Sequence, residues 1–143
     1  MKMIASAAVF VIMSLFFVVS TESTPFEQVD KVGEVTIQVI DEFGDIVIND
    51  THSFTDIDTL YSLLEDHYTV EYSNVSLGRI LLGIENVNTD FERDFLQIRI
   101  TGKLFMPDGS TLNLDNAPSP VGIDRIPLVD GNTYIFKYQR IGN

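Results

Sequence analysis

The sequence predicts an α+β domain in which one helix packs on a mixed β-sheet. Hydrophobic and polar residues alternate in several separate stretches, which is typical of half-buried strands. A single stretch after Ser53 instead repeats its hydrophobic residues at helical spacing. The resulting order is a strand pair, a helix and then several strands, which favours an α+β arrangement. With 143 residues, one domain is expected.

The N-terminus has the pattern of a secretory signal peptide. Lys2 precedes an uncharged hydrophobic run over residues 4–19, and small polar residues follow. We predict a signal peptide over residues 1–20, with cleavage after Ser20 or, alternatively, after Ser23. Because the run is just shorter than the roughly 20 residues of a spanning helix, a retained membrane anchor and a buried core helix remain alternatives. The expected location is secreted or extracytoplasmic, with membrane contact only if the segment is retained.

Residues 21–33 are interpreted as a linker, and residues 34–143 as the domain. Alternation at Val35, Ile37 and Val39 predicts a strand, and residues 41–45 a turn in which Gly44 takes a positive φ. Residues 46–48 resume extended structure and complete a hairpin. Thr55 or Asp56 is expected to cap the helix, with Thr55 and Asp58 approximating a capping box. The helix presents one hydrophobic face, formed by Ile57, Leu60, Tyr61, Leu64 and Tyr68, and closes at Asp66 and His67.

The rest of the chain predicts further strands at residues 69–72, 77–87 and 95–106. A turn at residues 107–109 pairs residues 104–106 with 111–114, and residues 116–120 are expected to be a loop. The domain is organised around residues 121–138, interpreted as a short strand, a tight turn at Asp130–Gly131 and a closing strand. That closing strand places Tyr134, Phe136 and Tyr138 on one face of the sheet.

Composition excludes several classes of function. The chain has 21 acidic and 9 basic residues and a net charge of −12, so nucleic acid is not an expected partner and anionic membrane surfaces repel it. It has no cysteine, which excludes disulfides, thiolate catalysis and cysteine-ligated zinc.

The two histidines show no motif of a catalytic or metal site. His52 and His67 lie far apart in the sequence, outside any spacing typical of metal ligands, and we interpret them as ordinary surface or helix-end residues. No catalytic residues, metal ligands or cofactors are therefore predicted. The alternative is an enzyme of unfamiliar type that uses His52 or His67 with a nearby carboxylate.

The chain resembles the transcobalamin-like C-terminal domain family. The resemblance is carried by residues 35–44, Ser53–Phe54, the segment LGRILLGI at 77–84, residues 95–103, Gly122–Ile123, Asp130–Gly131 and residues 134–138. This family is a β-grasp-like module that closes transcobalamin and intrinsic factor and recurs in bacterial secreted and surface proteins. The resemblance implies a β-grasp-like mixed sheet with one packed helix.

We therefore expect a secreted, non-catalytic binding or interaction module whose partner is an unknown extracytoplasmic protein or small molecule. The alternative implied by the resemblance is an accessory small-molecule (cobalamin-like) binding protein that works with a partner domain. The glycine-containing segments 77–83 and 119–123 are expected to meet beside the end of strand 95–103. Exposed side chains there are candidate ligand-binding residues, and Arg79, Phe105 and Ile123 are selected. Replacing Arg79 or Phe105 by Ala is expected to weaken binding with little effect on stability.

Overall fold

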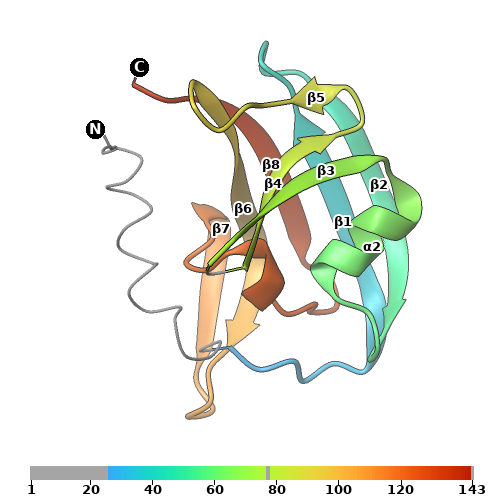
Figure 1. The fold of residues 1–143 in the computed structure, drawn as a ribbon. Coiled ribbons are helices and arrows are strands. Elements are labelled where there is room, and N and C mark those ends of the chain that lie inside the picture. Colours follow the sequence, from blue (N-terminus) through green and yellow to red (C-terminus); the bar gives the residue numbers. More distant parts are fainter. Residues whose placement is uncertain (1–25, 77, 143) are drawn as a thin grey trace.

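The computed structural model describes residues 26–76 and 78–142, which form two sheets, an α-helix and a short 3₁₀ helix (Figure 1). The predicted signal peptide at residues 1–20 lies outside the described residues. The larger sheet has the order β2-β1-β8-β6-β7 and the smaller sheet the order β3-β4-β5. The elements are β1 (Val32–Ile40), β2 (Ile46–Thr55), α2 (Leu60–His67), β3 (Val70–Val75), β4 (Gly78–Ile84), β5 (Val87–Asn88), β6 (Asp94–Phe105), β7 (Thr111–Pro118), η1 (Ile123–Arg125) and β8 (Thr133–Arg140). The predicted α+β class is confirmed.

The larger sheet is mixed because its first and last strands lie side by side. β1 pairs with β8 in parallel, with Ile37 opposite Tyr134 and Val39 opposite Phe136. All other pairings in this sheet are antiparallel. Parallel neighbours need a long crossover connection, so the helix, the smaller sheet and β6–β7 are all inserted between the two central strands.

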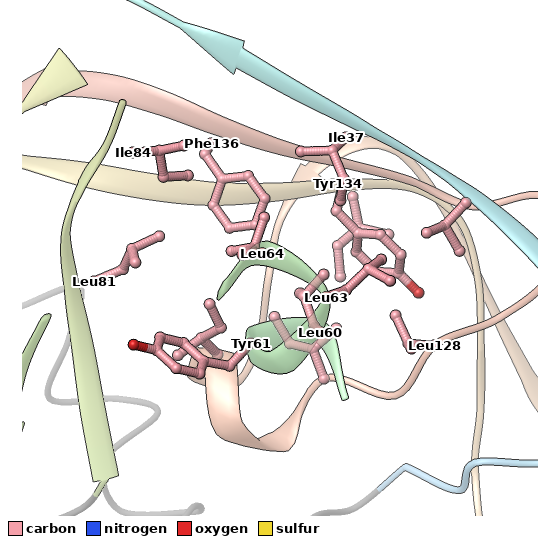
Figure 2. Packing of buried hydrophobic residues seen from close by; sticks show 14 of the residues in the cluster. Ile37, Leu60, Tyr61, Leu63, Leu64, Leu81, Ile84, Leu128, Tyr134 and Phe136 are labelled. Atoms are coloured by element: carbon pink, nitrogen blue, oxygen red, sulfur yellow. The ribbon is translucent and has the colours of Figure 1, made fainter. Parts of the chain in front are cut away.

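The hydrophobic core lies between the larger sheet and a second layer made by α2 and β4 (Figure 2). The closing strand contributes Tyr134 and Phe136, which were predicted to share one face of the sheet and are both fully buried. The helix contributes Leu60 and Leu64, which are also fully buried, and the helical spacing is thereby confirmed. Each such side chain stabilises the fold by roughly 1.5–3 kcal/mol through removal from water. α2 and the smaller sheet thus cover the same face of the larger sheet (Figure 1).

The helix begins later than the sequence predicted. β2 runs on to Thr55, and the Thr55 amide and hydroxyl donate to Asp58 Oδ2 at 2.8 and 3.3 Å, so this pair closes a turn instead of capping a helix. The N-cap is Thr59, which forms a capping box with Ser62. Ile57 precedes the helix and is 86% exposed, so its assignment to the hydrophobic face was wrong.

Two predictions in the C-terminal half are also corrected. β7 continues to Pro118, through a register shift near Asn116, where a loop was expected. Asn116 has a φ of 51° at this register shift. The backbone is irregular there, but the strand does not end. The short strand predicted before the Asp130–Gly131 turn is instead the 3₁₀ helix η1 followed by extended chain.

The described part of the predicted linker packs on the domain. Phe26 is 6% exposed and belongs to the core. The side-chain amide of Gln28 pairs with the backbone of Leu128, since its Nε2 donates to the Leu128 carbonyl and its Oε1 accepts from the Leu128 amide, both at 2.7 Å. The packed domain therefore reaches back at least to Phe26, before the predicted boundary at residue 34.

Candidate functional site

A cleft of about 490 Å³ opens between the β1–β2 turn and the β4–β5 turn. One wall consists of the turn itself and the start of β2, including Phe43 and Val47. The opposite wall consists of Glu85 and its neighbours up to the start of β5, and Tyr138 of β8 also lines the cleft. Phe43 is 79% exposed and Val47 49% exposed, so apolar surface remains open to a ligand on this side of the molecule.

Local hydrogen bonds hold both walls of the cleft in place. Asp41 Oδ1 accepts from the amides of Phe43 and Asp45 at 2.9 and 3.0 Å, and Gly44 supplies the positive φ of 85° that closes the turn. On the other wall the Glu85 carboxylate accepts from the amide of Thr69 at 2.8 Å. The turn is therefore closed by its own local hydrogen bonds. The Phe43 side chain, which is 79% exposed, does not pack in the core.

The cleft is acidic as well as partly apolar. Asp41, Glu42 and Glu85 all line it. The Tyr138 hydroxyl donates to Asp94 Oδ2 at 2.6 Å, and this hydrogen bond is the main reason that the pKa of Tyr138 is raised. Tyr138 therefore directs its proton to Asp94. The arrangement suits a ligand that carries both an apolar group and positive charge.

Arg79, the first predicted site residue, is occupied by contacts within the protein. Its guanidinium binds the Asp124 carboxylate with Nη2 2.7 Å and Nε 3.0 Å from Oδ1, and the Arg79 amide donates to Asp124 Oδ2 at 2.8 Å. The hydrogen bond that the Arg79 guanidinium donates to Asp124 is the main reason that the pKa of Arg79 is raised. The guanidinium carbon also lies 3.8 Å from the ring centroid of Tyr61. These contacts of Arg79 connect β4 to η1 through Asp124 and to α2 through Tyr61.

The other two predicted site residues lie in different settings. Ile123 is 2% exposed and packs in the core, so the expectation that it offers an exposed side chain was wrong. Phe105 is half-buried at the end of β6, where its carbonyl accepts from the amide of Glu27 at 2.8 Å. Among residues 26–76 and 78–142, no hydrogen bond, ion pair or ring contact joins Phe105 to Arg79, so the three do not form one site.

The fold brings together the two histidines that the sequence separates. The imidazole rings of His52, on β2, and His67, at the end of α2, stack with centroids 3.9 Å apart and planes inclined by 22°. Nε2 of His52 lies 2.7 Å from the Tyr68 hydroxyl, which donates to Asp50 Oδ2 at 2.8 Å. Burial, followed by the neighbouring His67, lowers the pKa of His52, while Asp50 opposes this effect.

Sequence reasoning missed this cluster because it ended β2 too early. Had the alternation been followed from Ile48 through Asp50 and His52 to Phe54, both polar residues would have been placed on the helix-facing side of the strand. Their encounter with the end of α2 depends on long-range packing that spacing along the chain does not encode.

Other kinds of site are not evident in the part of the chain that the structure describes. Within residues 26–76 and 78–142, no three His, Cys, Asp or Glu side chains converge as a metal cage. In the same residues, no helix is both long and hydrophobic enough to span a bilayer.

Comparison with known proteins supports the fold without assigning a family. No family model matches the chain, and no curated protein matches it. Among solved structures, the chain is similar to a protein from Ruminococcus gnavus ATCC 29149 described as a "putative metal binding protein", with 18% identity and a TM-score of 0.50. The similarity covers 76% of this chain and 97% of that one. At this identity the likeness concerns the fold alone.

Proposed function

We propose that the chain is a secreted, non-catalytic binding module with a β-grasp-like fold that takes its ligand in the cleft beside Phe43. The observation that carries the proposal is the cleft itself. Its volume of about 490 Å³ falls within the range of roughly 300–1,000 Å³ typical of small-molecule sites. The highly exposed Phe43 is the kind of side chain that dominates binding energetics, because aromatic residues bury much apolar area.

The sheet topology supports the β-grasp-like description and the resemblance to the transcobalamin-like domain. β1 and β8, the first and last strands, lie in parallel at the centre of the larger sheet. β2 pairs with β1 on one side, and the β6–β7 hairpin pairs with β8 on the other. The helix follows the second strand in the chain and packs across one face of the larger sheet (Figure 1). In such a module, binding occurs at strand ends and turns because the helix covers one face, which agrees with the position of the cleft.

The ligand chemistry follows from the lining. The carboxylates of Asp41 and Glu85 create a negative potential around apolar surface, whereas that of Glu42 lies 4.0 Å from Arg140 Nη2. An amphipathic cation, either a small molecule or a basic aromatic segment of an extracytoplasmic protein, meets both requirements. Nucleic acid and anionic membranes do not, since the whole chain carries a net charge of −12.

A binding screen with a matched pair of variants tests the proposal. Protein produced from the full chain is screened by thermal shift against aryl-substituted amines, basic aromatic peptides and cobalamins. Phe43→Ala should weaken any hit by about tenfold or more, because it removes an aromatic contact worth about 1–2 kcal/mol or more. Ile57→Ala is the control, since Ile57 is 86% exposed but does not line the cleft. Equal loss in both variants, or no loss in either, would place binding elsewhere.

The same screen addresses the accessory, cobalamin-like alternative and secretion. Cobalamin binding that appears only when a partner domain is added would favour the alternative over an independent module. Fractionation of the expressing cells tests secretion, since the proposal requires the protein outside the cytoplasm. Turnover of a hydrolase substrate that disappears on replacement of a single side chain would contradict the non-catalytic assignment.

A further inference from the structure

The stacked histidines lie in a cluster whose hydrogen bonds determine which nitrogen atoms are free. The Tyr68 hydroxyl has one proton and donates it to the Asp50 carboxylate, which can only accept. Tyr68 therefore has only an oxygen lone pair to offer His52, so His52 Nε2 must donate its N–H at the 2.7 Å contact. This assigns the Nε2–H tautomer to His52 and leaves Nδ1 with an unshared electron pair.

This arrangement is the one found behind metal-ligating histidines. Such a histidine donates its other ring N–H to a carboxylate or another acceptor, and that contact fixes the tautomer and the ring orientation. Here Tyr68 is the direct acceptor and Asp50 polarises it from behind. The Tyr68 hydroxyl directs its proton to Asp50 Oδ2 at 2.8 Å and so presents only a lone pair to His52.

His67 supplies a second imidazole with freedom to turn. It is exposed at the last position of α2, and in residues 26–76 and 78–142 its ring has no hydrogen-bond partner; its contacts are the stack on His52 and a tilted approach to Tyr68. Two nitrogen atoms that share one metal at about 2.0–2.1 Å each lie roughly 3–4 Å apart. The ring centroids are 3.9 Å apart in a stack inclined by 22°, so the two in-plane lone pairs run side by side, and sharing one ion requires the exposed His67 ring to rotate out of the stack.

We propose that His52 and His67 form a two-histidine site for a divalent late transition-metal ion, bound through His52 Nδ1 and one ring nitrogen of His67. Tyr68 and Asp50 are positioning residues. Water completes the coordination, because no third His, Cys, Asp or Glu of the described residues joins the pair in a cage. Imidazole nitrogens suit Cu²⁺, Ni²⁺ and Zn²⁺, and Cu²⁺ binds most tightly of these to a given set of nitrogen ligands.

The metal site is separate from the cleft beside Phe43. The residues that form it, which are Asp50, His52, His67 and Tyr68, do not line that cleft. Metal binding by His52 and His67 is therefore independent of any ligand in the cleft. The negative charge of the chain favours the approach of a divalent cation to either region.

Titration of the protein with Cu²⁺ tests the site directly. Protein produced from the full chain without a polyhistidine tag is titrated calorimetrically near neutral pH, with Ca²⁺ as a hard-cation comparison. We expect one Cu²⁺ per chain, nitrogen hyperfine structure from two imidazoles in the electron paramagnetic resonance spectrum, and no comparable heat with Ca²⁺. His52→Gln and His67→Gln should each weaken Cu²⁺ binding by about tenfold or more, and Ni²⁺ and Zn²⁺ should bind more weakly than Cu²⁺.

Further variants separate ligands from positioning and charge effects. Tyr68→Phe removes the acceptor for His52 Nε2–H and should weaken binding by about tenfold while the two-nitrogen spectrum persists. Asp56→Asn removes an exposed carboxylate elsewhere and should leave affinity unchanged, as should Phe43→Ala in the cleft. Circular dichroism shows whether each variant is folded, and exposed His67 is the safer of the two histidines to replace.

The proposal is overturned if the double variant His52→Gln/His67→Gln binds Cu²⁺ as tightly as the parent, because the ion would then be held by carboxylates or the terminal amine. It is also overturned if the folded parent protein shows no imidazole nitrogen in its Cu²⁺ spectrum. Failure of every cleft ligand in the earlier screen has no bearing on either result.

Discussion

The side-chain amide of Asn132 pairs with the backbone of Lys103 as a neighbouring strand would. Asn132 Oδ1 accepts from the Lys103 amide and Asn132 Nδ2 donates to the Lys103 carbonyl, both at 2.8 Å. Asn132 is 2% exposed and is the single buried polar residue among the described residues. Its amide nitrogen also lies 3.2 Å from the Tyr134 hydroxyl. Through Lys103, Asn132 connects the turn before β8 to the C-terminal part of β6.

Replacing Asn132 by Ala should destabilise the protein by about 2–4 kcal/mol. The change leaves the Lys103 amide and carbonyl without their partners in a partly buried position, and each unsatisfied group costs about 1–3 kcal/mol. Urea unfolding monitored by circular dichroism measures the loss. Asn113→Ala, at an exposed position on β7, is the control and should change the free energy of unfolding by less than about 0.5 kcal/mol. Equal values for the two variants would show that the pairing does not contribute.

Gly102 makes room for that pairing, so Gly102→Ala should be at least as damaging. Gly102 has a φ of 139°, and a Cβ there would lie 2.5 Å from Asn132 Cγ. Gly109→Ala separates the two causes, since Gly109 also has a positive φ, 92°, but no atom within 4 Å of the added carbon. We expect about 1 kcal/mol for Gly109→Ala from backbone strain and about 3 kcal/mol or more for Gly102→Ala from strain and overlap. Similar losses in thermal unfolding would argue against the overlap.

Local patterns predicted the elements of this fold better than their limits or partners. Leu60, Tyr61 and Leu64 were placed on one helical face because helical spacing is a local property. The start of the helix was misplaced because Thr55 and Thr59 both precede a residue that can complete a cap, and only tertiary packing selects Thr59. The parallel pairing of β1 with β8 joins residues almost a hundred positions apart, which no local pattern encodes.

The candidate sites were harder to predict than the fold. Ile123 lies beside Gly122 in a segment that resembles an exposed loop, but it turns into the core from a 3₁₀ helix. Arg79 was selected as an exposed binding residue, but it pairs with Asp124, and this partner could not be identified without the fold. The pairing of His52 with His67 likewise arises from packing between β2 and the end of α2.

Arg79→Ala should lower stability, which revises the expectation drawn from the sequence. The side chain connects β4 to Asp124 of η1 and covers Tyr61, whose hydroxyl is buried. About a third of both charged side chains is exposed, so solvent screening limits the ion pair, and roughly 1–2 kcal/mol is expected from the pair and the cation–π contact together. Arg93→Ala is the control, because Arg93 is 85% exposed in its pair with Asp90 and should cost less than about 0.5 kcal/mol. Unchanged thermal unfolding of Arg79→Ala would restore the original expectation.

The free energy of unfolding should depend on the protonation of His52. Burial and the nearby His67 lower the pKa of His52 below its ordinary 6.5, and Asp50 only partly offsets them. As the pH falls, the unfolded chain therefore binds a proton at this histidine before the folded protein does. Acidification thus stabilises the unfolded state relative to the folded state and lowers the free energy of unfolding. The contribution of neutral His52 is fully present above pH 6.5 and is lost as the pH falls from 6.5 to the lower pKa of the folded state.

His52→Gln isolates this effect from the titration of the carboxylates. Urea unfolding of the parent and the variant is compared from about pH 8 to about pH 5, the range in which histidine titrates and most carboxylates do not. We expect the difference in free energy of unfolding, parent minus variant, to be constant above pH 6.5 and to decrease below it. Asp50→Asn should enlarge the pH dependence of the parent, because it removes the charge that raises the pKa of His52. A difference between parent and His52→Gln that does not change with pH would show that His52 titrates normally in the folded protein.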